Sequence, residues 1–239
     1  MNELGLFAKF WQPGRVKTRL AADLDENASC SLYQHFLSHL INQLGQAGDC
    51  RTIVYSPTDR TPEFQLAAGN CWRTTPQAEG DLGQRMRTFF ELSLNRPADS
   101  SNSGNSSTRK TVVIGSDCPQ LTASNIQQAF DQLDREPVVL GPTDDGGYYL
   151  IGMRDECYGV FEDIEWSTER VLTQTRERLE SLGIGWTELD QKSDIDTLKD
   201  LLAYHADAIA TSQPGSADFN LQGAIAGVLA AQPNAGGKA

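Results

Sequence analysis

Positively charged side chains gather near the start of the chain, beside a Pro-Gly pair. The segment reads Pro13-Gly14-Arg15-Val16-Lys17-Thr18-Arg19-Leu20 and follows a short apolar run, Leu4 to Ala8. A glycine turn after a strand can direct backbone N–H groups toward phosphate oxygens, and nearby Arg and Lys side chains then add hydrogen bonds of about 1.5–3 kcal/mol each. The predicted phosphate-binding residues are Pro13, Gly14, Arg15, Lys17 and Arg19. A solvated basic turn is the alternative interpretation.

Carboxylates stand at two later places where a divalent metal ion could bind. Asp117 follows the apolar run Thr111 to Ile114, and Pro119 would bend the chain away and leave the carboxylate at the end of a strand. Asp194 and Asp196 would lie on one side of an extended segment. Mg²⁺ or Mn²⁺ needs only one or two protein carboxylates when phosphate oxygens complete its coordination. We therefore expect Asp117, with Asp194 or Asp196, to hold the ion. Alternatively, Asp196 caps a helix that begins near residue 197.

A third polar group precedes a predicted strand from Tyr148 to Met153. The sequence Asp144-Asp145-Gly146-Gly147-Tyr148 would form a turn there, and its carboxylates and aromatic ring suit the hydroxyl groups of a sugar or an acceptor. We favour Asp145 over Asp144. Farther along, Trp166-Ser167-Thr168 would be either a wall of the acceptor site or an aromatic residue before a Ser-capped helix. The predicted acceptor-site residues are Gly146, Gly147, Tyr148, Trp166 and Ser167.

Alternating strands and helices would position these groups. Four short apolar or β-branched runs have the character of buried parallel strands; they are Leu4 to Ala8, Arg51 to Tyr55, Thr111 to Ile114 and Val138 to Leu140. Apolar residues spaced three and four apart predict amphipathic helices over 32–44 and 126–133. The alternation implies an α/β fold with a mostly parallel sheet and helices on both faces. Ligands of such sheets bind beyond the carboxyl ends of the strands, where two of the polar groups should meet.

Composition narrows the possible partners and the cellular compartment. The 239 residues include 20 Lys and Arg against 32 Asp and Glu, a formal net charge of −12 that would repel a polyphosphate backbone. We expect no nucleic-acid partner. Five cysteines without metal-ligand spacing suit a reducing cytosol. The sequence has no apolar run long enough to span a bilayer, so the prediction is a cytoplasmic protein without a membrane span.

Several motifs, taken in chain order, resemble those of a known family. They are Pro13-Gly14 through Leu20, Gly80-Asp81-Leu82-Gly83-Gln84-Arg85-Met86, Gly115 to Pro119, Asp145 to Gly152, Trp166-Ser167-Thr168, and Asp194 to Asp196. As a set they resemble the glycosyltransferase-like family called radical-SAM/selenodomain-associated transferase 1, which lies within the GT-A nucleotide-diphospho-sugar transferase superfamily and close to 2-phospholactate guanylyltransferase. The resemblance covers about residues 4–204. It implies a three-layer α/β/α GT-A fold with a mostly parallel sheet.

The resemblance also implies roles for residues. It makes Asp117 a metal ligand, with Asp194 or Asp196 completing the site. A second segment resembles the part of related pyrophosphorylases that contacts the nucleotide base, where glycines would let the backbone approach a base edge. Its residues are Gln77, Gly80, Asp81, Gly83 and Arg85. A helix N-terminus capped by Asp81 is the alternative. The predicted catalytic residues are Lys17, Asp117 and Asp145.

The resulting prediction is a metal-dependent enzyme that transfers a sugar from a nucleotide-sugar to a small-molecule acceptor. One feature keeps a second reaction open. Many GT-A glycosyltransferases carry Asp-x-Asp after the central strand, whereas Ser116 here precedes a single Asp117. That pattern is nearer to nucleotidyltransferases, which move a nucleoside monophosphate to a phosphorylated acceptor. A non-catalytic nucleotide-binding protein of the same fold is a third possibility. The base, the sugar, the acceptor and the oligomeric state stay open.

We divide the chain into two parts on composition. Residues 1–210 form the predicted GT-A-like transferase domain, interrupted by a polar segment at about 97–110 that we expect to be a flexible loop. Residues 211–239 are predicted to be a linker, a short Ala-rich helix and a frayed tail.

Overall fold

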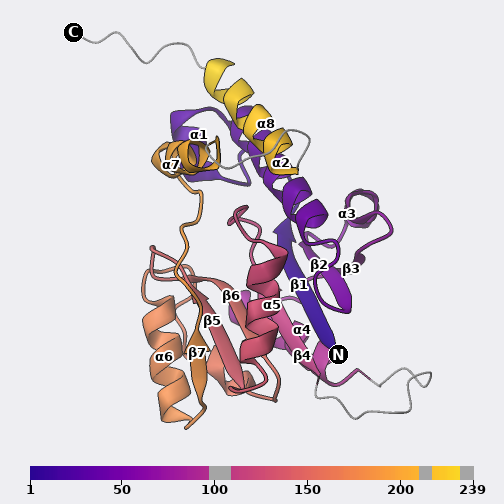
Figure 1. Ribbon diagram of the computed structural model, residues 1–239, viewed down its shortest axis with the longest axis vertical. Helices are drawn as coiled ribbons and strands as arrows, with labels where there is room; N and C mark the ends of the chain where they lie inside the picture. Colours follow the sequence, from indigo (N-terminus) through magenta and orange to yellow (C-terminus); the bar gives the residue numbers. More distant parts are fainter. Residues whose placement is uncertain (97–108, 210–216, 232–239) are drawn as a thin grey trace.

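A twisted sheet forms the centre of the computed structural model, which describes residues 1–96, 109–209 and 217–231 (Figure 1). The loop predicted at 97–110 lies almost wholly outside these residues. Within them, seven strands pair in the order β3-β2-β1-β4-β6-β5-β7. The strands are β1 (Asn2–Lys9), β2 (Cys50–Ser56), β3 (Arg73–Pro76), β4 (Lys110–Ile114), β5 (Val138–Pro142), β6 (Tyr148–Met153) and β7 (Trp186–Glu188).

The sheet is mostly parallel, as expected. Strand β1 lies between β2 and β4 and is parallel to both, so that Leu6 is opposite Ile53 on one side and Ile114 on the other. The exception is β6, which runs antiparallel to both of its neighbours, β4 and β5. The carboxyl ends of β1, β4 and β5 and the amino end of β6 therefore share one edge of the sheet. This edge carries the motifs.

Helices cover both faces of the sheet, because successive strand residues point to opposite sides. In β1, Leu4 and Leu6 pack with α2, α3 and α5, whereas Phe7 packs with α4, η1 and α6. The result is the three-layer α/β/α arrangement predicted from the sequence. The helices are α1 (Thr18–Asp23), α2 (Glu26–Gln43), α3 (Thr61–Ala68), α4 (Leu82–Leu94), α5 (Ala123–Gln132), η1 (Tyr158–Phe161), α6 (Val171–Ser181), α7 (Leu198–Ile209) and α8 (Ala217–Ala231).

A smaller core lies at one end of the molecule, where α1, α2, α7 and α8 meet (Figure 1). Leu221 and Ile225 of α8 are buried there together with Leu20, Leu32 and Phe36. The Ala-rich helix expected near the carboxyl end therefore forms and packs against α2. In the described part of the chain, the helices are all too short or too polar to cross a membrane.

Candidate functional site

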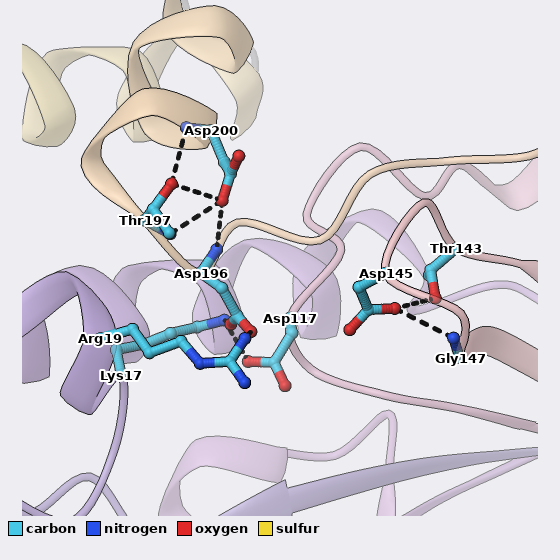
Figure 2. A network of polar contacts seen from close by, with 9 residues as sticks. All are labelled: Lys17, Arg19, Asp117, Thr143, Asp145, Gly147, Asp196, Thr197 and Asp200. Carbon is cyan, nitrogen blue, oxygen red and sulfur yellow. Dashed lines mark hydrogen bonds and ion pairs between the residues drawn. The ribbon is translucent and has the colours of Figure 1, made fainter. Parts of the chain in front are cut away.

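Lys17 lies at the centre of the polar groups on the motif-bearing edge. Its Nζ atom is 2.6 Å from Asp117 Oδ1 and 3.0 Å from Asp196 Oδ1 (Figure 2). The lysine side chain is only 3% exposed, whereas those of Asp117 and Asp196 are 48% and 35% exposed. Arg19 reaches the other oxygen of Asp196 at 3.4 Å. The structure thus brings the basic segment and both acidic segments together. The positions of the basic segment and Asp117 after strands predicted their meeting, whereas no strand position predicted that of Asp194 and Asp196.

The backbone directs the lysine inward. Lys17 is the N-cap of α1 and has the left-handed conformation, with φ 48° and ψ 46°. Burial by itself would lower the pKa of Lys17, but the ion pairs with Asp117 and Asp196 raise it above the ordinary value. The ammonium group is therefore charged at neutral pH. A left-handed residue other than glycine costs about 1–3 kcal/mol and is often found at functional sites.

The second acidic segment reaches Asp117 because the chain after β7 runs along the edge of the sheet. Lys192 donates its backbone N–H to Pro142 O, and Ile195 donates to Asp117 O at 3.1 Å. The buried Ile195 anchors this segment in the small core. Asp194 and Asp196 on either side of it are thereby fixed beside Asp117.

The alternative role of Asp196, capping the next helix, is wrong. Thr197 caps α7 instead, because its hydroxyl oxygen accepts the Asp200 N–H at 3.3 Å. Asp200 in turn accepts the N–H groups of Thr197 and Asp196 at 2.8 and 3.3 Å. The Asp196 carboxylate is left to contact Lys17 and Arg19 (Figure 2).

Excess negative charge at this position suits a divalent cation. Burial, and then the nearby Asp117 carboxylate, raise the pKa of Asp194 to about 7. Within the described residues, the cations that pair with these three carboxylates are Lys17 and the largely exposed Arg19. No three Asp, Glu, His or Cys side chains in the described residues converge as a ready-made metal cage. Carboxylate oxygens nevertheless fit Mg²⁺ or Mn²⁺, which take their remaining ligands from phosphate and water.

A tight turn between β5 and β6 holds Asp145. Its Oδ1 atom accepts hydrogen bonds from the Thr143 hydroxyl at 2.6 Å and the Gly147 N–H at 3.0 Å (Figure 2). Both contacts use the same oxygen and leave Oδ2 for a ligand. Asp144, by contrast, accepts hydrogen bonds from Gln191 and Ser193 and holds the segment after β7 in place. Asp145 therefore has a carboxylate oxygen open to a ligand, whereas both oxygens of Asp144 are used, and the role of Asp145 stays a prediction.

Gly146 links this turn to the wall opposite. It has φ +85°, and a Cβ atom there would lie 2.0 Å from Glu169 O. Its own carbonyl oxygen accepts the Leu172 N–H at 2.8 Å. The Asp145 turn and the start of α6 are thus in direct backbone contact.

A cleft of about 630 Å³ opens between these elements. Asp145, Asp194 and Asp196 line it together with the predicted acceptor residues Gly147, Tyr148, Trp166 and Ser167. Tyr148 contributes its ring only, because its hydroxyl group is buried in the interior. The other lining residues are Arg19, Leu82, Thr143, Thr168, Glu169 and Val171. The Ser-capped-helix alternative for this segment is wrong, since α6 begins at Val171 with Arg170 as its N-cap.

The predicted base-binding segment lies at the start of α4, and Asp81 does cap that helix. Its carboxylate accepts the Gln84 N–H at 2.8 Å, and Gln84 Oε1 accepts the Asp81 N–H at 3.0 Å. Gly83 packs directly on Trp166, because a Cβ atom at Gly83 would lie 2.5 Å from Trp166 Nε1. The start of α4 therefore borders this cleft.

Gln77 and Arg85 tie this segment to the sheet. Gln77 donates to Val54 O at 3.0 Å and to Ala8 O at 3.4 Å, at the ends of β2 and β1. Arg85 donates to Gly80 O at 2.8 Å and to Gln77 Oε1 at 3.3 Å. Both N–H groups of the Gln77 amide are thus directed at the backbone, which leaves only its oxygen for a base. The base-binding role of this segment remains a prediction.

The tip of the basic segment stays open to solvent. Gln12 O accepts the Arg15 N–H at 3.0 Å across the turn at Pro13 and Gly14. In the described part of the molecule, the exposed Arg15 side chain has no ion pair or hydrogen bond. Arg15 is therefore available to an anion without giving up another partner.

Sequence reasoning missed two residues that shape the site, Tyr33 and Thr143. The Tyr33 hydroxyl lies 2.9 Å from the Ser116 hydroxyl and accepts the Lys9 N–H at 2.9 Å. It thereby joins the ends of β1 and β4 beneath Asp117. On the apolar stripe of α2, Tyr33 looks like any core aromatic residue. Thr143 precedes the acidic turn, and only its position two residues before Asp145 could have indicated its role.

The fold is that of the nucleotide-diphospho-sugar transferases, and the polar groups lie at the edge of the sheet where such α/β sheets bind ligands. Residues 40–168, more than half of the chain, match the family described as "Uncharacterized protein conserved in bacteria (DUF2064)", and the chain belongs to that family. No curated protein matches the sequence.

Solved structures share the fold. One is a protein of Desulfovibrio desulfuricans G20 that carries the provisional name nucleotide-diphospho-sugar transferase, with 27% identity, a TM-score of 0.84 and 96% of each chain covered. A nucleotidyl transferase from Methanothermobacter thermautotrophicus has 14% identity and a TM-score of 0.58 over 89% of this chain and 99% of the other. CMP:2-keto-3-deoxy-manno-octonic acid synthetase, solved with CTP, has 9% identity and a TM-score of 0.55 over 88% and 99%.

Proposed function

We propose that this protein is a metal-dependent transferase that moves a sugar from a nucleotide-sugar donor to a small-molecule acceptor. The observation that carries the proposal is the meeting of Asp117, Asp196 and the buried Lys17 at the edge of a cleft that also contains Asp145. Cations and carboxylates for a diphosphate thus lie next to a cavity with aromatic walls for a sugar or acceptor.

In this proposal each residue has a defined task. Asp117 with Asp196 or Asp194 would hold Mg²⁺ or Mn²⁺, which supplies positive charge to the diphosphate oxygens. Lys17 and Arg19 would hold phosphate oxygens from the other side, and Arg15 would add a contact at the open end of the turn. Asp145 would accept the proton of the acceptor hydroxyl at its free oxygen. Catalysis would rest on positioning and on electrostatic stabilisation of the leaving diphosphate.

A second candidate reaction is nucleotidyl transfer, in which pyrophosphate leaves. Ser116 favours it, because its hydroxyl contacts Tyr33 in the interior and the position before Asp117 offers no second carboxylate. The loop after β4 thus departs from the Asp-x-Asp pattern of many glycosyltransferases. We also infer that the chain is allied to radical-SAM/selenodomain-associated transferase 1 and 2-phospholactate guanylyltransferase, whose motifs it resembles. The third candidate function is nucleotide binding without catalysis.

Product analysis separates these three functions. The protein, stripped of metal with EDTA, is incubated with nucleotide-sugars or with nucleoside triphosphates, with and without Mn²⁺. Release of nucleoside diphosphate from a nucleotide-sugar supports sugar transfer. Release of pyrophosphate from a nucleoside triphosphate, together with a nucleotidylated product, would instead show nucleotidyl transfer. If nucleotide raises the melting temperature but no turnover occurs, the protein binds nucleotide without catalysis.

The Asp117→Asn variant tests the site itself. Activity should fall by about 10²-fold or more, because one strong electrostatic contact is removed from the phosphate site. Asp134→Asn is the matched control, since Asp134 also pairs with a lysine, Lys110, at 2.5 Å but at the opposite edge of the sheet. Wild-type turnover in Asp117→Asn would refute the assignment.

A further inference from the structure

The charges around the cleft restrict the chemistry of the acceptor. Among the residues that line the cleft, Arg19 is the single basic one. Four are acidic: Asp145, Glu169, Asp194 and Asp196. Arg19 is already paired with Asp196. A divalent ion bound to the Asp117 side would offset the charge of Asp194 and Asp196. It would leave Glu169, and in part Asp145, without a basic partner among the lining residues.

The same cleft has an apolar side. Leu82, the first residue of α4, is 42% exposed and lines the cleft beside Trp166. The Trp166 ring packs on Gly83 and against Phe161, with ring centroids 6.3 Å apart, so its position is fixed. Tyr148 and Val171 continue the wall. A rigid aromatic wall of this kind suits the apolar face of a sugar ring or an aromatic group.

We propose that the cleft selects a neutral acceptor that carries a hydroxyl group and an apolar face, and that it rejects phosphorylated or carboxylated acceptors. The inference rests on the proposed function and defines its acceptor class. Like charges placed close together in a binding site repel each other, so an acceptor phosphate facing Asp145 and Glu169 would bind poorly.

The chemical step fits a neutral hydroxyl. The acceptor O–H loses its proton to Asp145 Oδ2 as the acceptor oxygen bonds to the anomeric carbon of the sugar. The bond from that carbon to the phosphate oxygen breaks, and its electron pair leaves with the nucleoside diphosphate. Thr143 and Gly147 hold Oδ1 and so fix the direction in which Oδ2 receives the proton.

Matched acceptor pairs test the proposal by binding, independently of turnover. Calorimetric titration of 4-nitrophenyl β-glucoside and of its 6-phosphate into protein with Mn²⁺ and a nucleoside diphosphate should show at least about tenfold weaker binding of the phosphate. In the Glu169→Gln variant, the ratio of the two affinities should become several-fold smaller. Glu177→Gln, at an exposed position of α6 away from the cleft, should keep it. Equal or tighter binding of the phosphate, no binding of either compound, or a difference unchanged in Glu169→Gln would overturn the proposal.

A second pair of variants tests the apolar wall. Leu82→Ala should weaken 4-nitrophenyl glucoside several-fold more than it weakens glucose, whereas Leu92→Ala, on the same helix and 64% exposed, should change neither. An equal effect of Leu82→Ala on both ligands would overturn the apolar part of the proposal. Failure of the proposed function has a different signature: no nucleotide-sugar releases nucleoside diphosphate, while the glucoside still binds in preference to its phosphate.

Discussion

Lys17 is expected to bind phosphate, yet its ammonium group already contacts two carboxylates. Its side chain is nearly inaccessible, and Asp117 and Asp196 neutralise it. A divalent ion attracts carboxylate oxygens more strongly than an ammonium group does. We therefore expect metal binding at the carboxylates to free Lys17 for the phosphate. In this interpretation the lysine holds the two acidic segments together until metal and nucleotide arrive.

In the Lys17→Met variant, the free energy of unfolding should depend more strongly on bound metal than it does in the wild type. Methionine keeps the length of the side chain but leaves Asp117 and Asp196 facing each other without a cation. We expect a loss of about 1–3 kcal/mol in the free energy of unfolding in EDTA, with part of it regained in Mn²⁺. Urea unfolding with and without Mn²⁺ measures this. A metal-induced gain equal to that of the wild type would contradict the interpretation.

Arg15 and Lys17 should differ in their response to salt. Arg15 is exposed, so an ionic contact to phosphate is screened at high ionic strength, whereas contacts of the buried Lys17 are screened much less. The loss of affinity for a nucleoside diphosphate in Arg15→Ala should shrink as salt rises, and that in Lys17→Met should persist. Calorimetry at two ionic strengths decides. If Arg15→Ala binds like the wild type at low salt, Arg15 belongs to an ordinary surface turn.

The candidate site could be predicted in part because its residues follow strands. Asp117 and Lys17 come after separate parallel strands, so the rule for strand ends brings them to one edge. The sequence did not reveal that Lys17 turns inward, because that depends on a left-handed backbone at a lysine. Nor could it separate Asp145 from Asp144 by geometry, since both lie in one turn and differ only in which side chains reach them.

At the scale of elements, the turn between β5 and β6 is the most constrained part of the cleft. Gly146→Ala would place a methyl group against Glu169 O in a backbone conformation with φ +85°. We expect a loss of about 1–3 kcal/mol in stability and, because Asp145 would shift, a fall in activity. Gly223→Ala is the control, because space is open around Gly223 in the described residues. Chemical denaturation and turnover of both variants measure the effect, and matching stabilities would show that the turn can relax.

Two variants at the start of α4 distinguish helix capping by Asp81 from a contact between Asp81 and the nucleotide. Asp81→Ala removes a reciprocal cap and should cost about 1 kcal/mol. If Asp81 also contacts the nucleotide, affinity should fall more in this variant than in Gln84→Ala, which breaks the other half of the same cap. Nucleotide titration of the two variants makes the comparison. Equal affinities would leave Asp81 with the capping role alone.

At the scale of the whole molecule, the small core joins α8 to the segment predicted to bind phosphate. Ile225 of α8 is fully buried with Leu20 of α1, three residues after Lys17. Ile225→Ala should cost about 2–5 kcal/mol through the lost contacts and the cavity left behind. Leu202→Ala, 48% exposed on α7, should cost much less. Thermal denaturation of both variants measures the difference, and equal melting temperatures would show that α8 contributes no stability.

The packing of α8 against α2 also shows what the sequence patterns did not predict. The linker expected after residue 210 indicated a break in the chain, and the domain boundary there stays a prediction. The apolar residues of α2 were nevertheless a usable signal: Leu37 and Leu40 face the sheet, whereas Leu32 and Phe36 face α8. An apolar surface wider than one stripe indicates a helix covered on two sides. The direction of β6 had no such signal, since a short apolar strand reads alike in either direction.

The reversed direction of β6 gives the molecule a modular construction. Strands β3, β2 and β1 form one half of the sheet and the hairpin of β5 and β6 lies in the other, with β4 between them (Figure 1). Strand β1 leads into the cationic turn, Asp117 follows β4, and Asp145 lies in the turn of the hairpin. The hairpin tip and the segment before α6 contact each other through Gly146 and Glu169. Under the proposed function, replacing these two pieces together, as in a chimera with another family member, would exchange the acceptor while the residues proposed to bind the donor stayed in place.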